Sequence, residues 1–394
     1  MAAPPIRDGW VDVADGRVSA VGSDRGAAND FRDLGHVAIL PGLVNAHTHL
    51  ELSHLDAQIP PGNDFVAWIR AVVATRRNNS DPRAAHIVDA VQSGIAQAVR
   101  CGTAVVGDIS NTLVPFDWLA RSPLAGVVFY ELIRFNAPEP AGFVDQARRQ
   151  LSALIETDRI RASLAAHAPY SVAPMVFRAI RQAVDQKANV PYSVHLSESA
   201  DEVEFIGTGG GQWRSFLEGV GAWDPNWRAP GGSPVQYLEE CGFLGPQLLA
   251  VHGVQMTSAD LARLAAHGAT LVTCPRSNVR TGAGVPPVTQ FYRSGVRVAV
   301  GTDSLASTPD LNVFAELAEL RRLAPDVPAS KLLDSATRQG ARALGFEADY
   351  GTIEPRKRAR LLAVSVPDRV DDVEEYLVSG IQPDQIQWLD SGAF

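Results

Sequence analysis

Eight short apolar or β-branched runs alternate with helix-length amphipathic segments between residues 37 and 303, and this repeat constrains the fold more than any other feature of the chain. Parallel strands need crossover connections of helical length, and eight such units in about 300 residues are typical of a closed (β/α)8 barrel. We therefore predict an α/β fold built on a TIM-type barrel. The predicted strands are 37–44, 104–107, 125–131, 162–166, 192–195, 248–252, 270–274 and 296–300.

Two of the intervening helices carry clear end signals. Asp81-Pro82 should open a helix that runs to Arg100, with Asp81 as N-cap and Pro82 in the first helical position. A second helix should begin at Thr257, with Asp260 three residues later, and end at His267-Gly268.

Both ends of the chain are strand-like and lie outside the predicted barrel. Residues 8–13 and 17–21 read as two strands around a turn at 14–16, and residues 351–392 are again strand-rich. We predict that residues 1–40 and 350–394 form one small β-sandwich beside a barrel of residues 41–349. A partner strand is expected before residue 8, which leaves open a missed upstream start codon.

A long insertion rich in Gly, Trp and Pro covers residues 207–234. Connections of this length inside a compact domain usually serve as lids or are disordered. Trp213, Trp223 and Trp227 favour an ordered lid.

Composition narrows the class of protein. The net charge of −9 and the pI near 5.5 argue against nucleic acid or an anionic membrane surface as partner. No run approaches the roughly 20 apolar residues of a membrane span, and no signal peptide is seen. Three widely spaced cysteines fit reduced thiols in a cytoplasmic protein.

The histidines follow the predicted strands. His47 and His49 are one residue apart on an extended segment, so both imidazoles point to the same side and together make half a metal site. Working residues of such barrels lie at the carboxyl ends of the strands. Each of these polar residues alone could have a structural role, but six of them at the same rim of the barrel indicate a functional site. The other four are His167, His195, His252 and Asp303.

The order His-x-His, His-x-x-Glu, His and Asp-Ser resembles the amidohydrolase superfamily, in particular its mononuclear-metal deaminases. The segments 41–47 (Pro-Gly-Leu-Val-Asn-Ala-His) and 273–278 (Thr-Cys-Pro-Arg-Ser-Asn) belong to the same pattern, and the match covers nearly the whole chain. The resemblance implies that one divalent ion, Zn²⁺ with Fe²⁺ as competitor, is held by four residues. They are His47, His49, His195 and Asp303.

The resemblance also implies the catalytic roles. The ion should lower the pKa of a bound water from 15.7 toward about 7, Asp303 should take a proton from that water, and His252 should orient it. Glu198, three residues after His195, is expected to act as general acid toward a ring nitrogen and the departing ammonia. The alternative role for Glu198 is that of a structural carboxylate at the start of the next helix.

Lysine usage favours one metal. Binuclear members of the superfamily bridge two ions with a carboxylated lysine at the fourth strand. Here that strand ends at His167, and none of the three lysines of the chain follows a predicted barrel strand. We therefore expect deamination of a heterocycle rather than hydrolysis of an amide ring.

Within the group the chain most resembles the aminodeoxyfutalosine deaminase branch, through residues 49–53, 167–171, 301–307 and the Trp-rich insertion. The implied reaction converts 6-amino-6-deoxyfutalosine to futalosine and ammonia in menaquinone biosynthesis. This purine nucleoside carries a benzoate, so Arg134 or Arg276 could bind its carboxylate through two parallel hydrogen bonds. The alternative for each arginine is a salt bridge at the rim of the barrel. His167 could contact the purine or support the metal ligands. A homodimer is expected from the resemblance.

Three alternatives remain open at this stage. The first is a deaminase of S-adenosylhomocysteine or methylthioadenosine, which would need an acid for the ribose after the first strand, where only Asp64 could serve. The second is a guanine or cytosine deaminase. The third, from another class, is a non-catalytic barrel that binds a ligand, which should have lost metal ligands.

Overall fold

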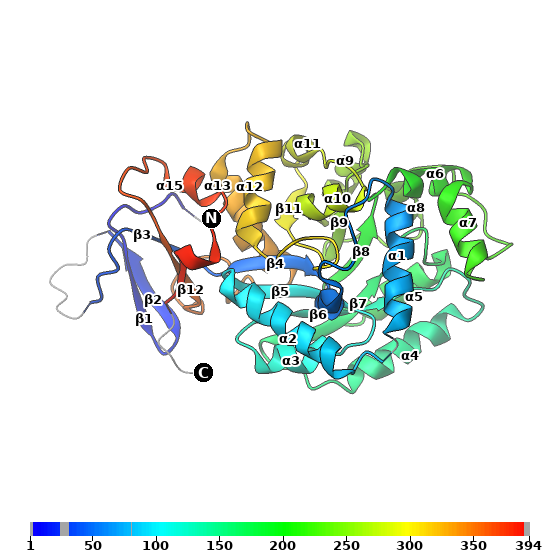
Figure 1. Ribbon diagram of the computed structural model, residues 1–394, viewed down its shortest axis with the longest axis horizontal. Coiled ribbons are helices and arrows are strands. Elements are labelled where there is room, and N and C mark those ends of the chain that lie inside the picture. Colours follow the sequence, from blue (N-terminus) through cyan, green and yellow to red (C-terminus); the bar gives the residue numbers. More distant parts are fainter. Residues whose placement is uncertain (1–2, 24–30, 80, 390–394) are drawn as a thin grey trace.

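The computed structural model describes residues 3–23, 31–79 and 81–389. At its centre, parallel strands pair in the order of the chain and helices surround them (Figure 1). The last strand meets the first, because the backbone N–H groups of Thr302 and Asp303 donate to the His47 carbonyl at 3.1 and 3.0 Å. The predicted (β/α)8 barrel is confirmed. Its strands are β4 (Leu43–Thr48), β5 (Thr103–Ser110), β6 (Ala125–Leu132), β7 (Ile160–Ala166), β8 (Tyr192–Leu196), β9 (Leu248–His252), β10 (Thr270–Thr273) and β11 (Arg297–Val300).

The helices that surround the barrel bury an apolar face against the strands. In α5, for example, Val176, Phe177 and Ile180 are fully buried at helical spacing. The helices of the barrel are η1 (Leu50–Leu55), α1 (Phe65–Asn78), α2 (Ala85–Arg100), α3 (Pro115–Arg121), α4 (Pro140–Ser152), α5 (Pro174–Val184), α6 (Ala200–Thr208), α7 (Gly211–Gly219), α8 (Pro234–Glu240), α9 (Ser258–Ala266), α10 (Pro275–Thr281), α11 (Val288–Arg293), α12 (Val313–Leu323), α13 (Ala329–Asp334), η2 (Ser335–Gln339) and α14 (Gly340–Ala343).

One of the two predicted helix starts is correct. The helix α9 has Thr257 as N-cap in a capping box with Asp260, as expected. The predicted start of α2 at Asp81 is wrong, because the helix begins at Ala85. The Asp81 side chain instead accepts the backbone N–H of Arg83 at 2.9 Å and so caps a preceding turn.

The predicted first strand, 37–44, is two strands. Residues of β3 (Val37–Pro41) pair antiparallel with β12, and only β4 belongs to the barrel. The chain changes sheet at Gly42, where a Cβ atom would lie 2.5 Å from the Cβ of Ala104. Glycine therefore allows the close approach that this junction requires.

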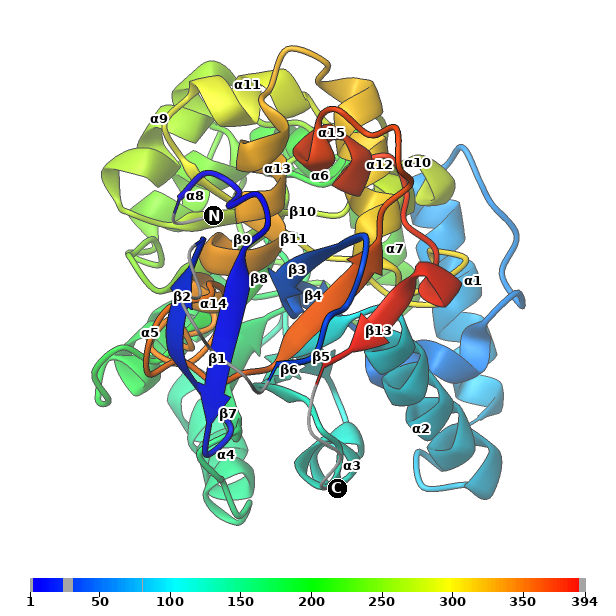
Figure 2. The ribbon, with the colours of Figure 1, turned by 90° about the vertical axis from the view of Figure 1, so that its left-hand side faces the viewer.

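Both chain ends build small antiparallel sheets beside the barrel, as predicted (Figure 2). One is the three-stranded sheet of β3, β12 (Leu361–Ser365) and β13 (Ile386–Trp388), and the other is the hairpin of β1 (Trp10–Ala14) and β2 (Arg17–Gly22). The same region contains α15 (Val373–Leu377) and η3 (Pro383–Gln385). Of the predicted end domain, residues 1–2, 24–30 and 390–394 lie outside the described residues, and the predicted boundaries at 40/41 and 349/350 stay predictions.

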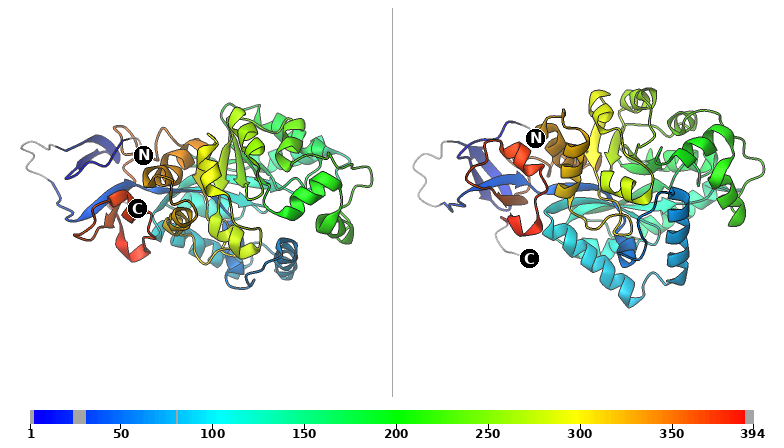
Figure 3. Two further views of the ribbon diagram at one scale, coloured as in Figure 1. Left: turned by 90° about the horizontal axis from the view of Figure 1, so that it is seen from above. Right: turned by 45° about the horizontal axis from the view of Figure 1, so that its top comes forward.

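The insertion at 207–234 contains the helix α7, at the end of the molecule opposite the small sheets (Figure 3), followed by turns and irregular structure over residues 220–233. Trp213 is buried and stacks on Tyr170 in the loop after β7, with ring centroids 3.7 Å apart. Trp227 stacks on Phe205 at 4.8 Å. These contacts tie the insertion to the barrel mouth, and its role as a lid stays a prediction. Across the described parts of the chain, none of the helices combines the length and apolarity that crossing a membrane would take.

Candidate active site

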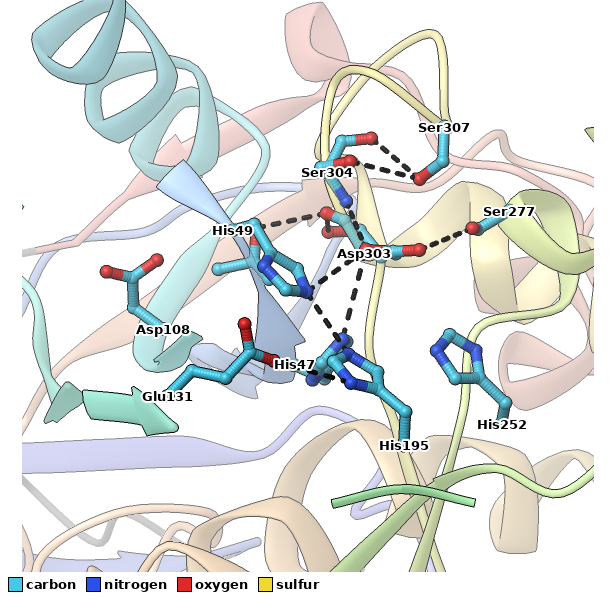
Figure 4. Close-up of polar contacts among 12 residues, drawn as sticks. His47, His49, Asp108, Glu131, His195, His252, Ser277, Asp303, Ser304 and Ser307 are labelled. Atoms are coloured by element: carbon cyan, nitrogen blue, oxygen red, sulfur yellow. Dashed lines mark hydrogen bonds and ion pairs between the residues drawn. The ribbon is translucent and has the colours of Figure 1, made fainter. Parts of the chain in front are cut away.

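The side chains of the predicted metal ligands meet at the carboxyl ends of the barrel strands (Figure 4). His47 and His49 lie on and just after β4, and their Nε2 atoms are 3.8 and 3.6 Å from Asp303 Oδ1. The Nε2 atom of His195, on β8, is 3.3 Å from Nε2 of His49. Four residues from three strands thus converge on one point, as the sequence predicts.

Burial keeps these imidazoles neutral and able to donate a lone pair. It lowers the pKa of His49 to about 3 and that of His195 to about 4, and it lowers the pKa of His47 well below its ordinary value. His195 Nδ1 donates to the His167 carbonyl at 2.9 Å, which leaves Nε2 as the unprotonated nitrogen facing the cluster.

His47 provides the test of whether these residues fit a metal ion. Its side chain is 1% exposed, yet neither ring nitrogen has a hydrogen-bond partner among the described residues. A buried polar atom without a partner costs about 1–3 kcal/mol, so the position needs a ligand for its Nε2 lone pair. Three neutral imidazoles and one carboxylate are a donor set that suits a divalent ion of the zinc type.

Asp303 is held in a fixed orientation. Its Oδ2 accepts the hydroxyl of Ser277 at 2.6 Å, and Oδ1 accepts the backbone N–H of Ser304 at 2.7 Å. Its φ of 64° is unusual for a residue with a Cβ, and His252 (77°) and Ser197 (53°) share this left-handed backbone. Such strain collects at functional sites, where the surrounding structure fixes side-chain direction.

Glu198 and His252 lie next to the predicted metal ligands and face each other. Glu198 Oε1 is 3.4 Å from His252 Nε2, and Asn278 Nδ2 donates to His252 Nδ1 at 2.9 Å, which places the imidazole proton on Nε2. Burial, with repulsion from Asp303 and Glu202, raises the pKa of Glu198 well above its ordinary value. A raised pKa favours the protonated form, the form in which a carboxyl can act as a general acid.

Glu202 supports the segment that carries Glu198. Its carboxylate is fully buried in the first turn of α6 and accepts the backbone N–H groups of Ser197 at 2.8 Å and Glu198 at 2.9 Å. These two bonds hold the left-handed backbone at Ser197. Burial raises the pKa of Glu202 to about 8, although the same hydrogen bonds lower it in part.

Glu202 should make stability depend on pH. Between its ordinary pKa of 4.5 and about 8, the folded carboxyl keeps a proton that the unfolded chain releases. The free energy of unfolding should therefore fall as pH rises through this window, by at most about 1.4 kcal/mol per pH unit. Denaturant unfolding of Glu202→Gln across this range should show a flatter dependence. Glu204→Gln, at an exposed position of the same helix, is the control and should keep the slope.

The three predicted substrate contacts have different surroundings. The His167 ring lies 5.1 Å from the His195 ring, and its Nδ1 is 2.6 Å from the Ser171 hydroxyl. Arg134 is exposed, with its guanidinium 5.0 Å from the Phe143 ring centroid. These surroundings do not identify a substrate, so both assignments stay predictions.

Arg276, the other arginine predicted to bind the substrate carboxylate, already forms ion pairs with two carboxylates of the chain. It donates to buried Glu316 at 2.7 Å and to Asp310 at 2.7 Å. Arg276 is the second residue of α10, which also carries Ser277 and Asn278. The ion pairs therefore fix the helix that orients Asp303 and His252.

Arg276→Met should destabilise the protein rather than weaken substrate binding. It leaves Glu316 buried without its cation, a change that costs about 3–5 kcal/mol in free energy of unfolding. The double variant Arg276→Met/Glu316→Gln should recover part of this loss in denaturant unfolding. A stable Arg276→Met protein with a raised KM for a carboxylate substrate would instead support the clamp.

Several supporting residues were not predicted from the sequence. Ser277 and Asn278 belong to a motif that was recognised but given no role. Glu131 is the last but one residue of β6, so the rule that polar residues lie near the ends of barrel strands could have found it. Asp108 is a buried acid in a mostly apolar strand, and burial raises its pKa well above the ordinary value. Glu202, inside a helix, lacked such a signal in the sequence.

The closed barrel and the buried His/Asp cluster at its carboxyl end define a metal-dependent (β/α)8 hydrolase. The model of the amidohydrolase family matches residues 38–384. This chain belongs to the amidohydrolase family. It is a hydrolase of the deaminase type, which acts on a carbon–nitrogen bond, and the His/Asp cluster supports a divalent metal ion.

Three known proteins illustrate the similarity. The aminodeoxyfutalosine deaminase of Deinococcus radiodurans is 34% identical over 328 residues, 79% of this chain and 74% of that protein. The 5-methylthioadenosine/S-adenosylhomocysteine deaminase of Syntrophobacter fumaroxidans is 30% identical over 375 residues, 90% of this chain and 80% of that protein. The crystal structure of an adenosine deaminase from Xanthomonas campestris, with bound zinc, superposes with a TM-score of 0.81 at 26% identity and covers 96% of this chain and 86% of that one.

Proposed function

We propose that this protein is a metal-dependent deaminase of an adenine-type nucleoside, and that it converts 6-amino-6-deoxyfutalosine to futalosine and ammonia in menaquinone biosynthesis. The observation that carries the deaminase chemistry is the buried carboxyl of Glu198, 3.4 Å from His252 Nε2 and beside the cluster of buried imidazoles. The similarity to the enzyme of Deinococcus radiodurans supports the choice of substrate.

In this proposal four residues hold one divalent ion, Zn²⁺ with Fe²⁺ as the alternative. When bound, the ion would make a water molecule acidic enough to supply hydroxide near neutral pH. The bound zinc of the Xanthomonas campestris enzyme supports this choice of metal. The ligands are His47, His49, His195 and Asp303.

The remaining steps are proton transfers by residues of this chain. Glu198 donates its proton to a ring nitrogen of the purine, which makes the amine-bearing carbon electrophilic. The Glu198 carboxylate then takes the proton of the hydroxyl group added to that carbon and passes it to the departing ammonia, and the proton that Asp303 took from the water restores Glu198. The Nε2 proton of His252 orients the attacking water, and the Asp303 carboxylate accepts a proton from it. Ser277 and Asn278 keep Asp303 and His252 in place.

Two observations weigh against the alternatives. Asp64, the acid that a methylthioadenosine or S-adenosylhomocysteine deaminase would use for the ribose, caps α1 by accepting the N–H of Ala67 at 3.0 Å. A non-catalytic binding barrel should have lost part of the site, yet every proposed ligand and Glu198 converge. Deaminases of guanine or cytosine remain for experiment to exclude.

A substrate panel tests the proposal. The zinc-loaded enzyme is assayed for ammonia release and loss of the adenine absorbance with 6-amino-6-deoxyfutalosine, adenosine, S-adenosylhomocysteine, methylthioadenosine, guanine and cytosine. We expect the highest kcat/KM for 6-amino-6-deoxyfutalosine. Preference for another compound would keep the deaminase chemistry and reject the menaquinone assignment.

A further inference from the structure

Arg76 is a cation that neither the metal cluster nor the proton-transfer steps use. It lies in the last turn of α1, and its side chain is 33% exposed. Its guanidinium reaches residues that follow β4 and β5: Nη2 donates to Glu51 Oε1 and Nη1 to Asn111 Oδ1, both at 2.9 Å. Arg76 therefore lies at the barrel mouth, on the side of β4 and β5.

The partners of Arg76 are themselves fixed. Glu51 is 4% exposed, and its Oε2 accepts the Ser110 hydroxyl at 2.7 Å and both the backbone N–H and the hydroxyl of Thr112. Asn111 Nδ2 donates to Glu131 Oε2 at 2.8 Å. The guanidinium is thus held by a hydrogen-bonded network anchored on two neighbouring strands.

This network leads directly to a predicted metal ligand. Glu131 Oε1 is 3.5 Å from Nδ1 of His195 and has no hydrogen-bond partner among the described residues. A charged group bound at Arg76 would therefore lie on the same side of the mouth as the reacting centre, separated from it by Asn111 and Glu131.

Arg76 keeps hydrogen-bonding capacity for a ligand. A guanidinium has five N–H groups, and two of them are used by Glu51 and Asn111. Within residues 3–23, 31–79 and 81–389, no further partner of Arg76 is found. Since its position is already fixed, binding an anion through the remaining N–H groups costs little additional side-chain entropy. Arg276 cannot serve in the same way, because its guanidinium is paired with two carboxylates.

We propose that Arg76 binds the carboxylate of the nucleoside substrate on the β4–β6 side of the barrel mouth and sets the preference for a carboxylate-bearing substrate. This inference rests on the proposed function and names the residue that recognises the benzoate end. A planar guanidinium and a carboxylate match through two parallel hydrogen bonds.

The experiment compares 6-amino-6-deoxyfutalosine with its carboxylate methyl ester, which keeps the nucleoside and removes the charge. The variants are Arg76→Met, Arg76→Lys, Arg134→Met and, as matched control, Arg77→Met, the next residue of α1, which is exposed. Circular dichroism and metal content verify that each variant is folded and loaded. For each protein, kcat/KM is measured on the acid and on the ester.

We expect Arg76→Met to lower kcat/KM on the acid about 10- to 100-fold and to leave the ester within about threefold. Arg76→Lys should lie between wild type and Arg76→Met on the acid, because lysine keeps the charge but not the planar fork. Arg77→Met should match wild type on both compounds.

Other results would overturn the inference. Equal losses on acid and ester in Arg76→Met would assign Arg76 to supporting the Glu51 and Asn111 network alone, and loss of the acid preference in Arg134→Met instead would assign the carboxylate to Arg134. In both cases the wild type still deaminates the acid, so the proposed function stands. A wild type that deaminates other adenine nucleosides but neither the acid nor the ester would reject both the function and the inference.

Discussion

Glu198→Gln should lower kcat/KM for the nucleoside about 10³-fold while the protein keeps its metal. Glutamine has nearly the same shape as glutamic acid but cannot donate an acidic proton to the ring nitrogen. The structure leaves no obvious substitute, because His252, at 3.4 Å, is the group that faces Glu198, and its own pKa is lowered well below the ordinary value by burial. Initial rates of ammonia release, with metal content measured in parallel, give the comparison.

The matched control is Glu204→Gln, which makes the same change at an exposed position six residues further along the chain. This variant should retain wild-type rates. If Glu198→Gln kept more than about a tenth of the activity, the carboxyl would be a structural group at the start of α6 and not the general acid.

Removal of the metal ion should have a still larger effect. Without an ion the pKa of water returns from about 7 to 15.7, so the hydroxide fraction at neutral pH falls by roughly eight orders of magnitude. Dialysis against a chelator should therefore abolish ammonia release, and one equivalent of Zn²⁺ or Fe²⁺ should restore it. His195→Ala should bind less than one equivalent of metal and stay inactive after reloading, since it removes one of the imidazoles that converge on the site.

Metal analysis by mass spectrometry verifies the stoichiometry. His36→Ala is a suitable control, because this side chain is 78% exposed and lies just before β3. A metal-free protein with undiminished activity, or a His195→Ala protein with a full equivalent of metal, would show that this cluster does not hold the catalytic ion.

The barrel and the metal cluster could be predicted because both rest on local patterns. Period-two alternation places His47 and His49 on the same side of a strand, and the carboxyl ends of parallel strands meet at one rim. Knowing that His195 and His252 end their strands was therefore enough to bring them together. The split of the first predicted strand at Gly42 was missed, because both halves are apolar and extended and differ only in their pairing partners.

The sequence by itself determined the fold class, the convergence of the His and Asp side chains and the position of Glu198, since each follows from periodicity and from place along a strand. Only the tertiary structure decided which polar side chains pair. Arg276 is bound to Glu316, 40 residues away, and Arg76 to Glu51, 25 residues away, while Glu202 turns back to the backbone of Ser197 and Glu198. Long polar side chains can reach many partners, and burial and hydrogen-bond geometry select among these partners. Neither burial nor hydrogen-bond geometry can be read from the local sequence.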